Sequence, residues 1–296
     1  MKAGVHLVHK RVGESSFDVV RRFKRAAAEE GLKKYPLGHG GTLDPFAEGL
    51  LLVLAGQATR LMELMHPLPK TYRAEVAWGR ETDTCDHLGA DVSGGGTVPP
   101  LAALEEALSA FLGWRDQVPP ATCAKKIGGE SAYKKAHRGE VFELPPSRVY
   151  LHEARWLAHD LPRASVLELT CRGGFYVRSL ARDLGRLLGC GAHLSGLVRT
   201  RIGPWEDPGP DREVLVEGDD LVPWCPGRIL APEEADHLLH GRPIAPGGVS
   251  TPAWTLPEGF PDPGAPVRAL FEGRLVALLQ EREGRLWTIA NLRGGL

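Results

Sequence analysis

The sequence predicts an α+β protein with a small β-rich segment at its C-terminal end. Residues 50–55 are all apolar, which is typical of a short buried strand. Residues 70–79 alternate between apolar and polar side chains, as strands with one buried face do. Three other stretches carry apolar side chains at helical spacing, and the C-terminal part contains short strand-like runs separated by Glu-Gly turns.

Length and composition predict two domains. The chain has 296 residues, of which 43% are hydrophobic, and this suits one large and one smaller domain with complete cores. Prolines within residues 223–226 mark the expected boundary, which gives domains of residues 1–225 and 226–296. The net charge of -1 gives no sign of a nucleic-acid partner, although an RNA site needs only a local basic face.

Cysteine usage and the N-terminal residues predict a cytoplasmic protein. The cysteines are scattered, odd in number and without Cys-x-x-Cys spacing, so we expect reduced thiols and no zinc site. They are Cys85, Cys123, Cys171, Cys190 and Cys225. The sequence has neither the apolar core of a signal peptide nor a run of membrane-spanning length, so we expect no membrane partner.

The first expected elements are a strand at residues 5–10 and a helix that begins at Ser15 and Ser16. Gly31 is expected to end this helix. Four apolar side chains share one helix face and are expected to point into the core. They are Phe17, Val20, Phe23 and Ala27.

A glycine-rich loop at residues 38–45 carries the clearest candidate for a catalytic group. Asp44 lies between flexible glycines and Pro45, which restricts the preceding backbone. The buried run at residues 50–55 follows, and a carboxylate beside a rigid element is what catalysis needs. On the Asp-Pro pair alone, a turn aspartate is the simpler interpretation.

A short helix is expected at residues 58–65, before the strand at 70–79. Tyr72 shares the apolar face of that strand, and by itself it is most simply a core aromatic residue. The acidic side chains of residues 82–86 raise the question of a metal site. Two aspartates in one loop do not establish the convergence that metal binding requires, so we expect a structured turn.

Residues 101–111 are expected to form a helix, and a basic segment follows it. Residues 125–139 contain four lysines, an arginine and a histidine. A solvated face is the usual explanation of such a run, and RNA phosphates are the alternative. Two strands are then expected, at residues 149–157 and 165–171.

The next helix is expected at residues 177–188, with Arg178, Arg182 and Arg186 in one row along it. Salt bridges to Asp183, or plain solvation, explain such a row most simply.

A further strand at residues 194–202 places Leu197 on the same face as Arg199 and Arg201. We therefore expect an apolar residue on a polar, basic face, and a lone exposed leucine is common. The C-terminal part is expected to form a small helix and three strands. Their ranges are 232–240, 267–271, 275–280 and 286–292.

Several motifs, in order, resemble those of the TruB family of bacterial tRNA pseudouridine synthases. Residues 38–51 resemble the catalytic motif of that family. In the first strand only Lys10 matches, because His9 and Arg11 stand where the family has Asp and Pro. The other matching blocks are Lys-x-Tyr-x-Ala at 70–74, Thr-Asp-Thr-x-Asp at 82–86, residues 119–139 with the basic segment, Gly-x-Tyr-x-Arg at 174–178 and Gly-Cys-Gly-Ala-His at 189–193.

The resemblance implies a fold and an activity. The fold would be the pseudouridine synthase fold, a mixed and largely antiparallel sheet flanked by helices. Residues 1–225 would form the catalytic domain, and residues 226–296 a PUA-like RNA-binding domain. The activity would be isomerisation of the uridine at position 55, in the T loop of tRNA, to pseudouridine. The resemblance also implies a monomer that needs no cofactor, no metal and no protein partner.

The resemblance further implies roles for individual residues. Asp44 would be the essential carboxylate, Arg178 would pair with it, and Tyr72 would stack on the target base. Whether Asp44 attacks ribose C1′, adds to uracil C6 or removes a proton stays open. The residues expected to bind the flipped nucleotide and its RNA are His39, Tyr176, Leu197, Lys126 and Arg60.

Three other functions remain to be weighed. The His39-Gly40-Gly41 sequence would suit the oxyanion loop of an esterase, but the sequence contains no Gly-x-Ser-x-Gly elbow. An aspartyl phosphotransferase would need a second carboxylate at a suitable spacing. The remaining alternative is a tRNA-binding folding chaperone with little or no catalysis, against which the presence of Asp44, Tyr72 and Arg178 argues.

Overall fold

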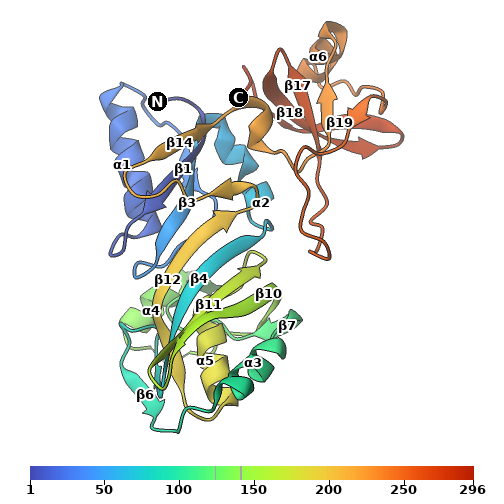
Figure 1. The fold of residues 1–296 in the computed structure, drawn as a ribbon. Helices are drawn as coiled ribbons and strands as arrows, with labels where there is room; N and C mark the ends of the chain where they lie inside the picture. The colour runs from blue at the N-terminus through green and yellow to red at the C-terminus, as the bar shows by residue number, and fades with distance from the viewer. Residues whose placement is uncertain (124, 141) are drawn as a thin grey trace. The chain divides into compact units, whose positions relative to one another are not determined.

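The computed structural model describes residues 1–123, 125–140 and 142–296, with a few side chains between residues 126 and 137 left undescribed. The chain folds into two compact units, which Figure 1 shows with their labelled elements. Unit 1 contains residues 1–68 and 201–296, and unit 2 contains residues 69–200. Within the described residues, no helix has the length and apolar character required to cross a membrane.

The N-terminal part of unit 1 is built on four strands. β1 (Gly4–Lys10) lies between β14 (Glu213–Val216) and β3 (Glu48–Ala55), and both pairings are antiparallel. β2 (Leu37–His39) pairs with the other edge of β3, also antiparallel. All residues of β3 except Glu48 are buried. This confirms the buried strand predicted from the uniformly apolar run, and the two faces of the strand belong to two apolar cores.

Helix α1 (Ser16–Glu29) begins with a capping box between Ser15 and Asp18. Phe17 is 53% exposed, so the prediction that it points into the core was wrong. Ser16 takes the inward position instead, because its hydroxyl bonds the backbone of Leu43. Val20, Phe23 and Ala27 are buried as predicted, and they follow Ser16 at helical spacing.

Unit 2 is built around a sheet with the strand order β12-β4-β11-β10-β7. The pairings of β4 with β11, β11 with β10, and β10 with β7 are antiparallel. The strands are β12 (Ala192–Ile202), β4 (Lys70–Trp78), β11 (Ala164–Cys171), β10 (Ser147–Asp160) and β7 (Gly113–Gln117). Every second side chain of β4 is buried, as the alternating sequence predicted.

Two helices pack on the strands of this sheet. Helix α3 (Leu101–Ser109) contacts β10, and helix α5 (Val177–Leu187) contacts β4 and α3. Gly189 follows the end of α5 and has a positive φ of +71°, a conformation that glycine adopts readily just after a helix.

The remaining elements outside the C-terminal region are short. Residues 58–65, predicted as one helix, form the 3-10 helix η1 (Gly56–Leu61) followed by a single turn of α2 (Met62–Met65). The others are β5 (Arg80–Thr82), β6 (Asp91–Gly94), β8 (Lys126–Ile127), β9 (Glu130–Ser131), α4 (Ala132–His137), β13 (Trp205–Glu206) and η2 (Gly218–Leu221).

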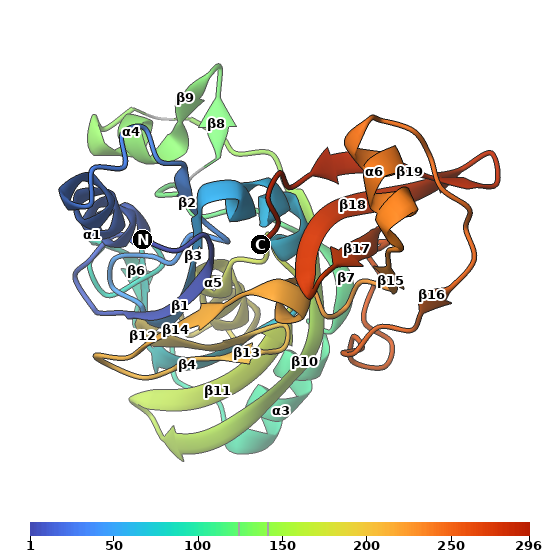
Figure 2. The ribbon, with the colours of Figure 1, turned by 90° about the horizontal axis from the view of Figure 1, so that it is seen from above.

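The C-terminal region of unit 1 forms a five-stranded sheet with α6 (Pro232–Leu239) beside it, as Figure 2 shows. The strand order is β16-β15-β17-β18-β19, and only the β15 and β17 pairing is parallel. The strands are β15 (Gly227–Ile229), β16 (Val249–Ser250), β17 (Val267–Phe271), β18 (Arg274–Arg282) and β19 (Arg285–Asn291). The predicted β-rich C-terminal end is thus confirmed.

Two apolar cores support this C-terminal sheet. One lies within the region itself and includes Leu238 from α6 together with Leu279 and Leu286. The second joins Leu278 and other C-terminal side chains to Leu52 and further residues of β1 and β3. A boundary between residues 225 and 226 stays a prediction, since part of the core is shared within unit 1.

Candidate active site

The loop that carries Asp44 is fixed by several main-chain contacts in unit 1. The Ser16 hydroxyl donates to Leu43 O at 2.9 Å and accepts from Leu43 N at 2.8 Å. On the other side of Asp44, the N–H of Gly13 donates to Pro45 O at 2.8 Å. The N–H of Ala47 donates to the carbonyl of Asp44 at 3.1 Å and closes a turn. The backbone of Asp44 is therefore held from both sides.

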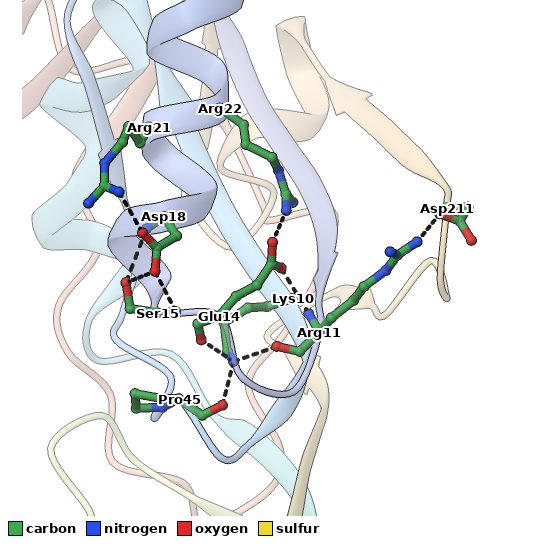
Figure 3. A network of polar contacts seen from close by, with 9 residues as sticks. All are labelled: Lys10, Arg11, Glu14, Ser15, Asp18, Arg21, Arg22, Pro45 and Asp211. Atoms are coloured by element: carbon green, nitrogen blue, oxygen red, sulfur yellow. Dashed lines mark hydrogen bonds and ion pairs between the residues drawn. The ribbon is translucent and has the colours of Figure 1, made fainter.

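A buried lysine adds a further tie to this loop, as Figure 3 shows. Lys10 is fully buried at the end of β1, and its ammonium group donates to the carbonyls of Arg11 at 2.9 Å and Glu14 at 2.7 Å. It also donates to Pro45 O at 3.4 Å and to Ala47 O at 2.5 Å. One cation thus joins the turn after β1 to Pro45 and Ala47, on the C-terminal side of Asp44. Sequence reasoning missed this role, although Lys10 was the one matching residue of the first strand.

His39 and Arg60 have different surroundings in the same unit. His39 ends β2 opposite Val53 of β3 and is half-buried. Gly40 follows because a Cβ there would lie 3.2 Å from the Leu52 side chain. Arg60 is exposed, and its guanidinium donates to the carbonyl of Asn291 at the end of β19. Arg60 therefore links η1 to the C-terminal sheet.

Tyr72 and Leu197 are both buried in unit 2, with exposed fractions of 7% and 6%. Tyr72 shares the buried face of β4 with Lys70. Leu197 belongs to β12, where Arg199 is 1% exposed and only Arg201 is exposed. Leu197 and Arg199 share one face of β12 as predicted, and both are buried, so Leu197 is not a lone exposed leucine.

Tyr176 and Arg178 stand at the beginning of α5. Gln117, at the end of β7, holds the Tyr176 backbone through both of its amide atoms. Its Oε1 accepts from Tyr176 N at 2.9 Å, and its Nε2 donates to Tyr176 O at 3.0 Å. Tyr176 is the N-cap residue, so Arg178 lies in the first turn of the helix. This contact fixes the direction in which the first turn presents its side chains.

The Arg178 guanidinium is buried and donates hydrogen bonds to groups of unit 2. Its Nη1 donates to Thr84 O at 3.0 Å, Asp86 Oδ2 at 3.2 Å and Thr122 Oγ1 at 2.7 Å. Its Nη2 donates to Thr122 O at 3.0 Å. Asp86 is the acidic partner of Arg178 within the unit, and it is buried as well. Pairing of Arg178 with Asp44 of unit 1 stays a prediction.

Asp86 is held by the turn that the Thr-Asp-Thr-x-Asp block predicted. Its Oδ1 accepts from Thr84 Oγ1 at 2.7 Å and from Leu88 N at 3.1 Å. The Thr82 hydroxyl donates to Asp86 O at 2.7 Å. The block is thus a structured turn that orients a carboxylate toward Arg178, a partner that sequence reasoning did not identify.

The other arginines of the α5 row have partners of their own. Arg182 donates to Asp183 at 2.8 Å and to Val118 O at 2.9 Å. Arg186 makes a two-point contact with Glu81 at 2.6 and 2.9 Å, and Glu81 is buried while Arg186 is 60% exposed. The predicted salt bridge to Asp183 is confirmed for Arg182, whereas Arg186 pairs with a carboxylate distant in sequence.

Arg178→Lys is expected to lower the free energy of unfolding by roughly 3 kcal/mol, because lysine keeps the charge but leaves buried acceptors such as Thr122 O without a donor. An ammonium group cannot reproduce the contacts that a planar guanidinium makes with several acceptors at once. Chemical denaturation measures this loss. Arg186→Lys is the matched control, since its mostly exposed side chain can keep a charge near Glu81. Equal losses in the two variants would contradict a special role for the Arg178 contacts.

Lys70 lies two residues before Tyr72 in an electropositive interior. Burial, together with the nearby Arg199 charge, lowers the pKa of Lys70 to about 7. Lys70 is 5% exposed, and it belongs to the same strand face as Tyr72. This environment favours the neutral form of Lys70, and it would favour the charged form only with an anion beside the ammonium group.

The lowered pKa of Lys70 predicts a pH dependence of stability. Between pH of about 7 and the ordinary lysine value of 10.5, the unfolded chain binds a proton that the folded chain does not. The free energy of unfolding contributed by Lys70 therefore rises with pH in this window. Lys70→Met should remove this rise, and urea unfolding of both proteins at several pH values measures it. Measurements kept below pH 9, the ordinary thiol value, avoid the titration of the buried Cys171, whose pKa burial raises to about 12. Parallel curves for the two proteins would contradict the prediction.

The predicted site residues divide between the two units. Asp44, His39 and Arg60 belong to unit 1, whereas unit 2 contains Tyr72, Lys126, Tyr176, Arg178 and Leu197. The Lys126 side chain lies outside the described part of the structure. Within that part, no three His, Cys, Asp or Glu side chains gather in a way that could hold a metal ion.

Known proteins resemble this chain in sequence. Residues 29–177 match the family described as TruB family pseudouridylate synthase (N terminal domain), and residues 178–222 match the tRNA pseudouridylate synthase B C-terminal domain. The tRNA pseudouridine synthase B of Thermobifida fusca is 35% identical over 304 residues, covering 96% of each chain. That of Caulobacter vibrioides is 35% identical over 291 residues, covering 92% of this chain and 90% of the other.

Solved structures resemble the fold. A Cbf5-Nop10-Gar1 complex contains a chain that matches with a TM-score of 0.67 and 22% identity, covering 98% of this chain and 84% of that one. A chain of an archaeal box H/ACA sRNP Nop10-Cbf5 complex matches with a TM-score of 0.62 and 23% identity, covering 98% and 85%. These likenesses confirm the predicted α+β pseudouridine synthase fold. With a family match across residues 29–222 and relatives 35% identical over almost the whole length, the chain belongs to the TruB family of pseudouridylate synthases.

Proposed function

We propose that this protein converts the uridine at position 55, in the T loop of tRNA, to pseudouridine. The observation that carries the proposal is the Asp44 loop, a carboxylate in the family's catalytic motif whose neighbouring backbone is tied by Ser16, Gly13 and Lys10. A rigid loop suits a group that must meet a reacting atom accurately. Relatives named tRNA pseudouridine synthase B support tRNA as the substrate.

The reaction breaks one bond and forms another within the same nucleotide. The N1–C1′ bond is cleaved, the uracil rotates, and C5 joins C1′ while N1 gains a proton and C5 loses one. No electrons or water are consumed overall, so the protein has to supply only a nucleophile or countercharge and a proton carrier. Asp44 is the group proposed for the first task, either at ribose C1′ or at uracil C6.

Side chains of unit 2 are proposed to complete this chemistry. Arg178 would keep the Asp44 carboxylate ionised and oriented, because a nearby guanidinium favours the charged form of a carboxyl group. Tyr72 would stack on the uracil and accept or relay the proton from C5. Tyr176 and Leu197 would give the rotating base an apolar enclosure, and the burial of Leu197 supports that role.

RNA binding is proposed to expose the target base. A uridine stacked inside the T loop has to leave the stack before C1′ becomes accessible, at a cost of a few kcal/mol. His39 would hold the nucleotide out of the loop, while Arg60 and Lys126 would contact the RNA. Residues 226–296 are proposed as an additional RNA-binding domain.

Release of tritium from a tRNA transcript labelled at uracil C5 tests the proposal. The protein should release tritium from the unmodified transcript and none from a transcript with cytidine at position 55. Binding of the transcript without any release would contradict the enzymatic proposal and favour a folding chaperone.

A further inference from the structure

Helix α1 presents an exposed aromatic ring with two cations over it. Phe17 is 53% exposed, and the guanidinium carbon of Arg21 lies 5.3 Å from its ring centroid. The ammonium nitrogen of Lys24 lies 5.2 Å from the same centroid. Residues 17, 21 and 24 follow each other at helical spacing, so the three side chains form one stripe on the helix surface.

The ring organises the two cations. The face of an aromatic ring carries negative potential and attracts a cation within about 6 Å. Long basic side chains are otherwise mobile and lose conformational freedom when they bind an anion. Side chains already held over one ring lose less, so binding costs less entropy. A lone exposed phenylalanine would be unremarkable, whereas Phe17 with Arg21 and Lys24 makes a positioned pair of charges.

The charges on α1 favour an anionic partner. The helix has four basic and two acidic residues. Arg21 also pairs with Asp18 at 2.9 Å, and Arg22 with Glu14. Among the described residues, no carboxylate lies within ion-pair distance of Lys24. Lys24 is therefore the cation of the stripe whose charge is fully available.

The stripe begins beside the Asp44 loop. Ser16, the neighbour of Phe17, is bonded through its hydroxyl to both main-chain atoms of Leu43, the neighbour of Asp44. Adding bond lengths along this path limits the separation of the Phe17 and Asp44 Cα atoms to about 15 Å. Both lie in unit 1 and are joined by buried contacts, so this separation is a fixed feature of the loop and helix.

We propose that Phe17, Arg21 and Lys24 form a phosphate-binding surface for the RNA strand that leads to the nucleotide at Asp44. Lys24 and Arg21 would bind backbone phosphates, and Phe17 would act as a positioning residue that holds both cations. RNA suits the surface because a polynucleotide whose target nucleotide lies at Asp44 carries closely spaced negative phosphates on either side of that nucleotide. This inference rests on the proposed function, and it specifies where part of the substrate backbone lies.

Salt-dependent tRNA binding and single-turnover isomerisation by the full chain test the inference. Lys24→Gln should weaken tRNA binding roughly threefold to tenfold and reduce the slope of log affinity against log salt by about 0.7 to 0.9. Phe17→Ala should weaken binding in the same direction, whereas Phe17→Tyr, which keeps a ring face, should bind as the wild type does. The isomerisation rate at saturating tRNA should be unchanged in all three variants.

Lys33→Gln is the matched control, because it removes one exposed charge beyond the far end of a helix about 20 Å long. Its affinity and salt slope should equal those of the wild type. An active wild type with unchanged binding by Lys24→Gln would overturn the inference, and so would equal losses in Lys24→Gln and Lys33→Gln. If the surface binds an acidic protein instead of RNA, Lys24→Gln will bind tRNA as the wild type does. A wild type that binds tRNA and does not isomerise it would contradict the proposed function alone.

Discussion

Asp44→Asn is expected to abolish isomerisation while tRNA affinity stays within about tenfold, or about 1.4 kcal/mol. The substitution removes the negative charge and nucleophilic oxygen but keeps the size of the side chain. The loop should keep its conformation, because the ties from Ser16, Gly13 and Lys10 all reach main-chain atoms of its neighbours. Single-turnover tritium release and filter binding with the same transcript measure the two quantities.

Asp211→Asn is a matched control for this prediction. It makes the same chemical change in unit 1, at a carboxylate that is 77% exposed and pairs with Arg11. Its activity should equal that of the wild type. Substantial tritium release by Asp44→Asn would show that the carboxylate is dispensable, and the proposed chemistry would have to be given up.

Lys10→Met is expected to lower the free energy of unfolding by about 3 kcal/mol and to slow isomerisation on the order of 100-fold. The apolar side chain would leave buried carbonyls, including that of Ala47, without their charged donor. The segment after Asp44 would lose its tie to the turn after β1, and small displacements of a catalytic group have large effects on rate. Urea unfolding and single-turnover rates, taken where the variant is still folded, measure both effects.

Lys2→Met provides the comparison for Lys10→Met. Lys2 is 75% exposed and stands just before β1, so its removal should change neither stability nor rate appreciably. If Lys10→Met unfolds at a lower urea concentration but isomerises at the wild-type rate, Lys10 stabilises the fold without positioning Asp44.

The elements that could be predicted from the sequence are those whose pattern has one dominant cause. β3 is apolar from residue 49 onward because its two faces lie in two different cores, one with Leu52 and the other with Leu51. β4 alternates because only one of its faces is buried. Phe17 could not be placed correctly from helical periodicity alone. The hydrogen bond between Ser16 and Leu43 puts Ser16, and not Phe17, on the buried face of α1. The burial of Arg199 could not be predicted either, because arginine side chains are usually exposed.

The candidate site was predicted through motifs, whereas its supporting contacts were not. The motifs single out Asp44 and Arg178 by their residue types and spacing. Asp86 lies 92 positions before Arg178 in the sequence, and Ala47 lies 37 positions after Lys10, so neither contact leaves a local pattern. Such contacts appear only once the fold is known, because register and loop path decide which distant carbonyls and carboxylates meet a given cation.

Mapping of pseudouridine at single-nucleotide resolution tests the central claim most directly. An unmodified tRNA transcript would be incubated with the wild type or with Asp44→Asn, and every uridine would then be scored for conversion. We predict conversion at position 55 by the wild type and none by the variant. Conversion at another uridine, or equal conversion by both proteins, would contradict the proposal that the Asp44 loop isomerises the T-loop uridine.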